Sequence, residues 1–398
     1  MKKKILFAYY SMIIGGSTTS LLSLINAIDR SKYDVYLILY RNNGELFNYI
    51  PENVTLLEPA ASKKNLVNDI KKILLAIFKG YLFKGLSYQI KNKKNKFPST
   101  LFSEIQAKYF SRKINQKFDI AIGGMEGWSD KYIAYRIDAD IKMCWLHSLY
   151  SKITDTPSLE IDWIEKIDYI VTISEACKID FCKLHPDFSY KAVVIKNILD
   201  KELVLKRACE DTDDKYIEKI KSFSGLKIIT VARFDPVKAL HRVVLSAKEL
   251  KNDNIDFLWT IIGDGIEKEK LLTLVEKNNL SDKVIFLGMK KNPYPFIKYS
   301  DLFCLTSYYE GTPVTVVESQ MLGVIPIVTE YPSAFDQIKN GKTGFVVQNT
   351  DMAVAEKIQA IYEKNNLIKE IKINLNKYDF SKNMELNDFY KYIEKIKS

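Results

Sequence analysis

The sequence predicts an α/β protein of two domains, each built on a mostly parallel sheet that is doubly wound with helices. The order strand, loop, helix recurs along the chain, which is typical of parallel sheets. The candidate strands are short runs rich in Val, Ile and Leu, as buried parallel strands are. A length of 398 residues is enough for two domains with a hydrophobic core each.

The candidate strands fall into two series. The first comprises residues 4–8, 34–39, 119–122, 141–146 and 169–173. The second comprises residues 226–232, 256–262, 283–287, 302–305, 325–328 and 344–347. Charges replace the apolar pattern near residues 197–210, so we expect one domain over 1–198 and another over 199–378. Residues 379–398 are predicted to form a C-terminal helix.

Composition narrows the range of partners and locations. The formal net charge of +10 favours anionic ligands or surfaces. Nucleic acid is not expected, because the basic residues are not interleaved with stacking aromatics. The five cysteines form no CxxC pair and no zinc spacing with histidine, which predicts a cytoplasmic protein without a disulfide framework or a metal site.

The N-terminus resembles a signal peptide, because Lys2, Lys3 and Lys4 precede an apolar run over residues 5–14. The Gly15-Gly16 pair that follows, and the periodic apolar residues after it, favour a strand, a glycine turn and a helix instead. No stretch of the sequence approaches the ~20 apolar residues that a membrane-spanning helix needs.

A basic segment over residues 63–117 interrupts the regular alternation of candidate strands and helices. Its only acidic residues are Asp69 and Glu104. Its apolar residues recur at the spacing of a helix, and they are Leu66, Ile70, Ile73, Leu74, Ile77, Phe78, Tyr81 and Leu82. Four lysines fall between them, namely Lys71, Lys72, Lys79 and Lys84. The segment is either an insertion helix packed on the first domain with a solvated basic face, or a surface that docks on anionic lipid.

Two glutamates follow the fourth strand of the second series. Thr312 and Pro313 predict a helix start with Thr312 as the N-cap, and Gly323 predicts the helix end. Glu310 then lies in the entering loop and Glu318 on the second helical turn, so that the two carboxylates can hold different ends of an elongated ligand. The free amides of the helix N-terminus suit a diphosphate. A solvated face or an ion-pair network would also explain the two acids.

Two cations follow the first strand of the second series. Arg233 and Lys238 lie in the loop after this strand, with Pro236 between them. Ligands bind at the C-terminal ends of parallel strands in such folds, and two cations match the charge of a pyrophosphate. The alternative is a pair of exposed cations at a helix start.

A glycine pair follows the second strand of this series, in the motif Gly263-Asp264-Gly265. The third glycine of a dinucleotide fingerprint is absent, because Lys268 occupies its place. We therefore expect only a tight turn here.

Together these motifs resemble the retaining glycosyltransferases of family four, which have the GT-B fold. Arg233 and Lys238 match the Arg-x4-Lys pair of that family, and Glu310 and Glu318 match its E-x7-E motif. Weaker matches are Gly15-Gly16, Asn197, Gly263-Asp264-Gly265, Gly323 with Pro326, and residues 341–344. The resemblance covers nearly the whole chain. It implies two Rossmann-like domains with a cleft between them, the last helix crossing back to the first domain.

The resemblance also implies a role for each matched residue. Arg233 and Lys238 would stabilise the diphosphate leaving group. Glu318 would hold the ribose, and Glu310 the hexose. Further donor contacts would come from Gly16, from backbone amides near Gly311, Thr312 and Val314, and from His147. A lone histidine such as His147 is also often structural.

Three departures from the family pattern leave the transferred sugar open. Thr312 stands where the family often has an aromatic or aliphatic residue, Val314 where it often has asparagine, and Ala239 where it usually has glycine.

The implied reaction is transfer of a hexose from a nucleotide-diphosphate sugar, with retention at the anomeric carbon and without a metal cofactor. UDP-linked donors are favoured over GDP-mannose. Spacing identifies no nucleophilic carboxylate, which favours a front-face displacement. The first domain would bind a saccharide or lipid-linked saccharide acceptor, as in bacterial surface polysaccharide synthesis, with the protein cytoplasmic or peripheral on the inner membrane face. Two rival functions are a sugar-nucleotide epimerase of the same fold and an inactive glycan- or nucleotide-binding partner subunit.

Overall fold

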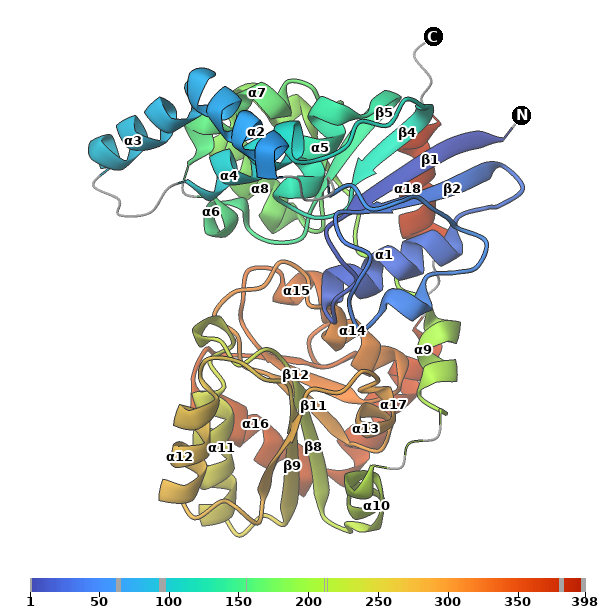
Figure 1. Ribbon diagram of the computed structural model, residues 1–398. Helices are drawn as coiled ribbons and strands as arrows, with labels where there is room; N and C mark the ends of the chain where they lie inside the picture. The colour runs from blue at the N-terminus through green and yellow to red at the C-terminus, as the bar shows by residue number, and fades with distance from the viewer. Residues whose placement is uncertain are drawn as a thin grey trace. The chain divides into compact units, whose positions relative to one another are not determined.

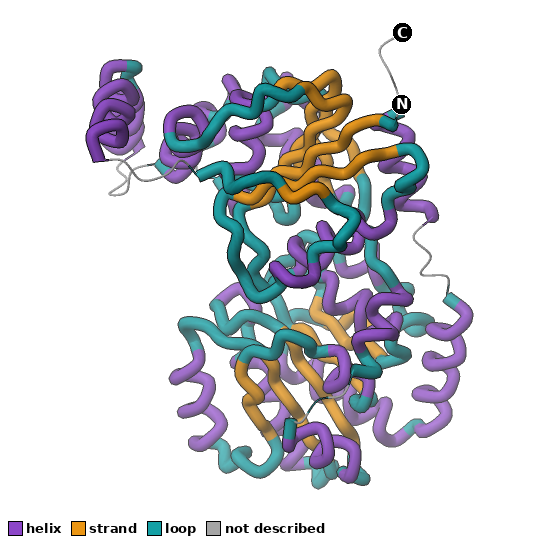
Figure 2. The backbone as a smooth tube through the Cα atoms, turned by 45° about the vertical axis from the view of Figure 1, so that its right-hand side comes forward, coloured by secondary structure: helices purple, strands orange, loops and turns teal. Residues whose placement is uncertain are grey.

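The computed structural model of the protein describes residues 2–61, 66–92, 98–154, 156–210, 212, 214–378 and 383–394. The chain divides into two compact units, each with a parallel sheet between layers of helices (Figures 1 and 2). The first unit consists of Met1–Ile198 and Lys382–Ser398, and the second of Leu199–Ser381.

The first unit is built on a parallel sheet, which has seven strands in the described residues. The strands are β1 (Lys3–Tyr9), β2 (Tyr33–Leu39), β3 (Thr55–Leu56), β4 (Lys117–Gly123), β5 (Asp138–Leu146), β6 (Tyr169–Thr172) and β7 (Ala192–Val194). Their order is β3-β2-β1-β4-β5-β6-β7. The order reverses between β1 and β4, where doubly wound sheets bind ligands.

Helices bury both faces of this sheet. Ile5 and Phe7 of β1 point to one face, which α1 (Gly16–Ala27) and α18 (Asn383–Ile393) cover. Leu6 and Ala8 point to the other face, which α5 (Trp128–Arg136), α7 (Ile161–Ile164) and α8 (Glu175–Leu184) cover. The remaining helix of this region is α6 (Tyr150–Ile153). Burial on both faces explains why the strands are apolar throughout rather than alternating.

The C-terminal helix α18 packs on the first sheet. Phe389 and Ile393 are fully buried in the core of the first unit. The backbone amide of Asp29 donates to the hydroxyl of Tyr390 at 2.8 Å, and the Tyr390 ring stacks on Tyr33. This helix therefore joins the first unit, although the chain enters it from the second.

The basic segment forms three helices, α2 (Leu66–Phe78), α3 (Tyr81–Asn92) and α4 (Ser99–Tyr109). The expectation of one continuous helix through Leu82 is wrong, because Gly80 adopts a positive φ of 82° between α2 and α3. Of the two interpretations of the apolar face, packing on the first domain is wrong for most of these residues. Six of the eight apolar residues are 43–85% exposed, and they are Ile70, Ile73, Leu74, Ile77, Phe78 and Leu82. Tyr81 is buried against α4, and the side chain of Leu66 lies outside the described residues.

The second unit is built on a parallel sheet, which has six strands in the described residues. The strands are β8 (Leu226–Val231), β9 (Phe257–Ile262), β10 (Val284–Gly288), β11 (Leu302–Leu305), β12 (Ile325–Thr329) and β13 (Phe345–Val347). Their order, β10-β9-β8-β11-β12-β13, is that of a Rossmann sheet. The order reverses between β8 and β11.

Two layers of helices enclose the second sheet. One face is covered by α11 (His241–Asn252), α12 (Lys268–Lys277), α16 (Asp351–Glu363) and α17 (Asn365–Lys377). The other face is covered by α9 (Lys201–Arg207), α10 (Lys215–Ser222), α13 (Tyr294–Lys298), α14 (Val314–Met321) and α15 (Ala334–Gln337). The predicted α/β class with two Rossmann-like, parallel-sheet domains is confirmed.

Candidate active site

The predicted cations and acids of the second unit follow the two strands at which its sheet order reverses. Lys238 ends the short 3-10 helix η4 (Pro236–Lys238), which follows β8. Glu310 lies in the loop between β11 and α14. Because β8 and β11 are neighbours, their C-terminal loops meet at the same edge of the sheet.

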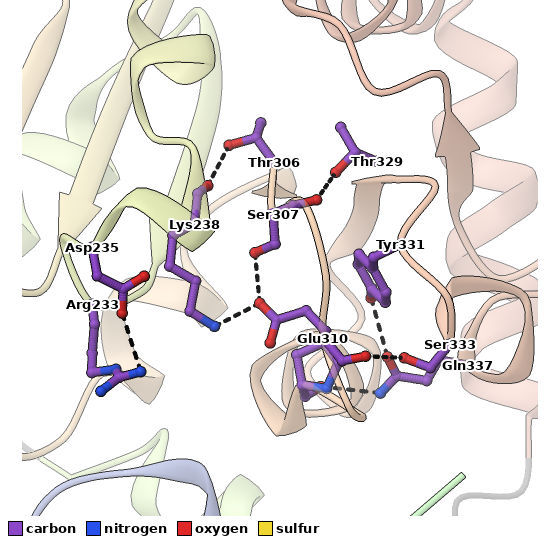
Figure 3. A network of polar contacts seen from close by, with 11 residues as sticks. Arg233, Asp235, Lys238, Thr306, Ser307, Glu310, Thr329, Tyr331, Ser333 and Gln337 are labelled. Carbon is purple, nitrogen blue, oxygen red and sulfur yellow. Dashed lines mark hydrogen bonds and ion pairs between the residues drawn. The ribbon is translucent and has the colours of Figure 1, made fainter. Parts of the chain in front are cut away.

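Lys238 and Glu310 form an ion pair in this place (Figure 3). The Lys238 Nζ atom lies 2.6 Å from Glu310 Oε1, and both side chains are largely buried, with 17% and 11% exposed. The Ser307 hydroxyl donates to the same Oε1 atom at 2.5 Å. Both described bonds of the carboxylate thus fall on one oxygen, which leaves Oε2 able to accept from a ligand.

Neighbouring hydroxyl groups hold the two loops in place. Thr306 Oγ1 donates to the carbonyl of Lys238 at 3.1 Å, which ties the end of β11 to the loop after β8. Thr329 Oγ1 donates to the carbonyl of Ser307 at 2.8 Å. Ser333 Oγ donates to the carbonyl of Glu310 at 3.2 Å. The ion pair therefore rests on a backbone that is fixed on both sides, as a preorganised site requires.

Arg233 lies in the same loop as Lys238, but its described ion pair has a different partner. Its guanidinium is 3.1 Å from Asp235 Oδ2 and its side chain is 81% exposed. Figure 3 shows this pair beside the Lys238 side chain. An exposed ion pair of this kind contributes little stability, so the guanidinium can turn to an anionic ligand at small cost.

Glu318 has a third environment, in the buried part of α14. Its side chain is enclosed, and Tyr294 donates to Oε1 at 2.9 Å. Arg207 lies over the Tyr294 ring at 5.0 Å. Burial raises the pKa of Glu318 to about 7, while the Tyr294 bond and the Arg207 charge oppose the rise. The structure thus joins Lys238 with Glu310 and gives Glu318 separate partners.

The start of α14 differs from the prediction. The helix spans Val314–Met321, with Pro313 at its N-cap position and no side-chain cap. The Thr312 hydroxyl donates to the Gly311 carbonyl at 2.7 Å, so the predicted N-cap role of Thr312 is wrong. The free amides that follow still begin at Val314. The predicted end is confirmed, because Gly323 has a φ of 72° directly after the C-cap.

The Gly263-Asp264-Gly265 turn supports the loop of Arg233. The Phe234 amide donates to the Asp264 carbonyl at 2.9 Å. Gly263 has a φ of 144°, and a Cβ atom there would lie 1.9 Å from the carbonyl oxygen of Ala232. The tight turn is therefore needed for close packing against the site loop, a role that the motif alone did not reveal.

Ala239 occupies a left-handed conformation directly after Lys238. Its φ is 49° and its ψ is 41°, and the residue is fully buried. An L-residue pays roughly 1 kcal/mol for this conformation, which glycine avoids. The backbone thus explains why glycine suits this position.

Two polar residues of the site were not predicted, Ser307 and Tyr294. Ser307 lies two residues beyond β11, so its place at a strand end was the available signal. Tyr294 begins α13, which is distant in sequence from Glu318, and no sequence pattern connects the two.

Gly16 and His147, the other predicted site residues, lie in the first unit. Gly16 is the first residue of α1, which has no side-chain cap and so has free amide groups at its start. His147 directly follows β5, and its Nε2 atom lies 3.0 Å from the Gly124 carbonyl. Its backbone amide donates to Glu126 Oε1. Burial lowers the pKa of His147, so the imidazole is neutral at pH 7.

Neither a metal-binding cluster nor a membrane-spanning helix occurs among the described residues. These residues hold no group of three His, Cys, Asp or Glu side chains that could bind a metal ion. Among the helices in the same described ranges, none is long and apolar enough to cross a membrane.

Comparison with known proteins places the second unit in a family. Residues 213–378 match the glycosyl transferases group 1 family. An uncharacterized glycosyltransferase of Methanocaldococcus jannaschii is 30% identical over 140 residues, which are 35% of this chain and 34% of that protein. The N-acetylgalactosamine-N,N'-diacetylbacillosaminyl-diphospho-undecaprenol 4-alpha-N-acetylgalactosaminyltransferase of Campylobacter jejuni is 26% identical over 186 residues, 46% of this chain and 47% of that protein. The chain thus spans between 34% and 47% of the length of these two relatives.

A solved structure extends the similarity over both units. Anabaena HepE in complex with UDP and glucose has a TM-score of 0.70 at 14% identity, covering 98% of this chain and 99% of that chain. At this identity the similarity shows the fold alone, which is the GT-B fold with two Rossmann-like domains. Residues 213–378, which include Arg233, Lys238, Glu310 and Glu318, belong to the glycosyl transferases group 1 family.

Proposed function

We propose that this protein is a retaining glycosyltransferase that moves a hexose from a nucleotide-diphosphate sugar to a saccharide or lipid-linked saccharide. The observation that carries the proposal is the Lys238–Glu310 pair at the point where the second sheet reverses its order. A cation for the diphosphate and an acid for the sugar are joined at the place where such sheets bind nucleotides.

Lys238 and Arg233 bind the diphosphate of the donor in this proposal. The Lys238 ammonium has three donors, and Glu310 uses one of them. Arg233 is exposed and leaves Asp235 for the more highly charged phosphate. Both cations stabilise the negative charge that grows on the leaving group as the bond to the hexose breaks.

Glu310 and Glu318 bind the two sugars of the donor. Glu310 Oε2 accepts from a hexose hydroxyl, while Oε1 keeps its bonds to Lys238 and Ser307. Glu318 accepts from the ribose hydroxyls beside Tyr294. Backbone amides near Gly311, Thr312 and Val314, together with Gly16 and His147, complete the donor contacts that the family resemblance implies.

The reaction proceeds with retention by a front-face displacement. The bond between the anomeric carbon and the phosphate oxygen breaks, and the acceptor oxygen forms its bond on the same face of the ring. The acceptor proton passes to the leaving phosphate oxygen, so that no protein base is needed. Metal chelation with EDTA is expected to leave turnover unchanged, because Lys238 and Arg233 supply the positive charge.

The donor is UDP-linked, and the acceptor belongs to bacterial surface polysaccharide synthesis. HepE, which shares the fold, is seen with UDP and glucose. The Campylobacter jejuni relative has a diphospho-undecaprenol-linked acceptor in its name. Both observations support the proposal without fixing the sugar.

The exposed helices α2 and α3 attach the protein to the inner face of an anionic membrane. Ten large apolar side chains on them are 43–85% exposed, namely Ile70, Ile73, Leu74, Leu75, Ile77, Phe78, Leu82, Phe83, Leu86 and Ile90. Exposed lysines lie on or between the same helices, namely Lys71, Lys79, Lys84 and Lys91. Such a combination of apolar and basic groups favours the interface of an anionic bilayer over a protein partner.

Product analysis tests the proposed reaction. The protein is incubated with UDP-glucose, UDP-galactose or UDP-N-acetylhexosamines and with membrane lipid-linked saccharides, and the products are separated by mass. Release of UDP together with a heavier acceptor supports the transferase, whereas an isomeric sugar nucleotide would indicate an epimerase. Binding without any product would indicate a partner subunit. An inverted anomeric centre in the NMR spectrum would overturn the retaining mechanism.

A further inference from the structure

A polar cavity of about 170 Å³ lies in the first unit. Its lining comes from the start of α4, the loop and helix that follow β4, and helices α6 and α7 that follow β5. The cavity therefore adjoins the C-terminal ends of β4 and β5, the edge at which α/β sheets bind ligands.

Two residues that line this cavity carry buried polar atoms without partners in the described part of the chain. Trp163 is fully buried, and its Nε1 donor has no hydrogen-bond partner among the described residues. Asp130 is 1% exposed, and its Oδ1 atom is likewise without a partner in the described part of the chain. A buried polar group left unsatisfied costs roughly 1–3 kcal/mol. Such groups are rare in folded proteins unless water or a ligand meets them.

Glu160 and Lys131 form an ion pair in the lining of the cavity. Glu160 accepts from the Tyr150 hydroxyl, and its other oxygen lies 3.8 Å from Lys131 Nζ. Lys131 also lies over the Trp163 ring at 5.0 Å. Burial raises the pKa of Asp130 well above its usual range. The Lys131 charge already faces Glu160, so an added anion would find no unpaired cation among the lining residues.

Glu126 links the lining of the cavity to His147. Glu126 lines the cavity and is half-buried, and it accepts a bond from the His147 backbone amide. Glu126 thus belongs both to the lining of the cavity and to the hydrogen bonds around His147.

We propose that this cavity binds an uncharged, hydroxyl-bearing sugar ring of the acceptor. Each sugar hydroxyl is both a donor and an acceptor, so one ring can satisfy the Trp163 donor and the Asp130 oxygen. The cavity of about 170 Å³ is many times larger than the ~10–15 Å³ that one enclosed water needs. This inference rests on the proposed transferase function for the identity of the ligand, but the binding itself can be tested alone.

The experiment measures binding of methyl glycosides of glucose, galactose, N-acetylglucosamine and N-acetylgalactosamine by saturation-transfer NMR. Ser103 lines the cavity and is half-buried, so the larger side chain of Ser103→Trp occupies part of it. Ser222→Trp, at an exposed site of the second unit, is the matched control. Trp163→Phe removes the indole donor while keeping the ring. Circular dichroism checks that each variant is folded.

We expect at least one glycoside to bind the wild-type protein and Ser222→Trp, with binding at least tenfold weaker in Ser103→Trp and several-fold weaker in Trp163→Phe. UDP affinity should be the same in all four proteins, and the acceptor KM should rise in the two cavity variants. Absence of glycoside binding to the wild type, or equal binding in folded Ser103→Trp, would overturn the inference and leave a water-filled cavity. If Ser103→Trp loses glycoside binding but the wild-type protein transfers no sugar, the binding site in the cavity stands and only the proposed reaction is refuted.

Discussion

Lys238 and Glu310 are separated by 72 residues in sequence, yet their side chains meet at 2.6 Å. The contact exists because β8 and β11 are neighbours and each residue lies in the loop after its strand. Neither side chain is more than 17% exposed, so water screens the pair only weakly.

Glu310→Gln should slow transfer while preserving UDP binding. The amide keeps the shape of the side chain but is a weaker acceptor for the hexose hydroxyl, and Lys238 becomes freer to bind phosphate. We expect kcat to fall about 100-fold, the size typical of one lost transition-state contact. Steady-state UDP release, with Kd for UDP from calorimetry, checks this. Glu276→Gln on the exposed face of α12 is the control. A fall in UDP affinity with normal kcat would assign Glu310 to the nucleotide instead.

Glu318 should make the protein less stable as the pH rises. Its folded pKa of about 7 exceeds the ordinary value of 4.5, so the folded state binds the proton more tightly. The stabilising contribution is complete below pH 4.5 and is lost as the pH rises through 7. The full shift corresponds to something on the order of 3 kcal/mol.

The Tm of the wild type should therefore fall more steeply between pH 5 and pH 8 than that of Glu318→Gln. Thermal unfolding followed by circular dichroism at several pH values measures both slopes. Parallel slopes would show that the Glu318 carboxyl does not titrate in this range.

Gly263→Ala should destabilise the second unit and weaken UDP binding together. The new Cβ atom would lie 1.9 Å from the Ala232 carbonyl, so the loop that carries Arg233 must move. We expect a loss of about 2 kcal/mol or more in the free energy of unfolding. Urea denaturation and calorimetry measure the two effects.

Gly341→Ala is the control for backbone strain. This glycine also has a positive φ, of 76°, but an added Cβ would meet no atom within 4 Å. Gly341→Ala should lower the free energy of unfolding by only ~1 kcal/mol and leave UDP affinity unchanged. Equal losses in the two variants would show that the packing of Gly263 on the Arg233 loop has no special effect.

Membrane attachment should depend on both the charges and the apolar groups of α2 and α3. The variant in which Lys71, Lys72, Lys79 and Lys84 become Gln should bind anionic vesicles at least tenfold more weakly, since each lysine contributes about 1 kcal/mol near such a surface. Phe78→Ser with Phe83→Ser should weaken binding without any change of charge. Vesicle co-sedimentation, with phosphatidylglycerol present or absent, measures both.

The control for net charge replaces four exposed lysines of the second unit by Gln, namely Lys219, Lys248, Lys277 and Lys364. This variant should bind vesicles like the wild type. Unchanged vesicle binding in the α2 and α3 variants would reject the membrane surface. Self-association of the wild type that Phe78→Ser with Phe83→Ser abolishes would show that a second copy of the chain covers these helices instead.

Long buried strands could be predicted from the sequence, because runs of Val, Ile and Leu mark them directly. The two shortest strands of the first sheet could not be. Thr55–Leu56 has two exposed residues and therefore no readable apolar pattern, and the three residues of Ala192–Val194 were not recognised as a strand. Helical periodicity likewise located the apolar residues of α2, but periodicity does not say what covers them. Phe78 fits the pattern and is 85% exposed.

The contact between Lys238 and Glu310 was foreseeable, because both follow strands that a doubly wound sheet places side by side. The separate setting of Glu318 was not, since Tyr294 reaches it from another helix. The prediction that Thr312 is the N-cap was wrong for a local reason. The Thr312 hydroxyl donates to the Gly311 carbonyl, and Pro313 occupies the N-cap position.

The most direct test of the account is a calorimetric titration of UDP, with uridine as the matched ligand without phosphate. The titration compares the wild-type protein with the double variant that carries both Arg233→Ala and Lys238→Ala. We expect UDP affinity to fall at least 100-fold in the variant, because each charge-assisted bond to phosphate contributes about 1.5–3 kcal/mol, while uridine affinity stays the same. Equal UDP affinity in the two proteins would contradict a diphosphate site at Arg233 and Lys238.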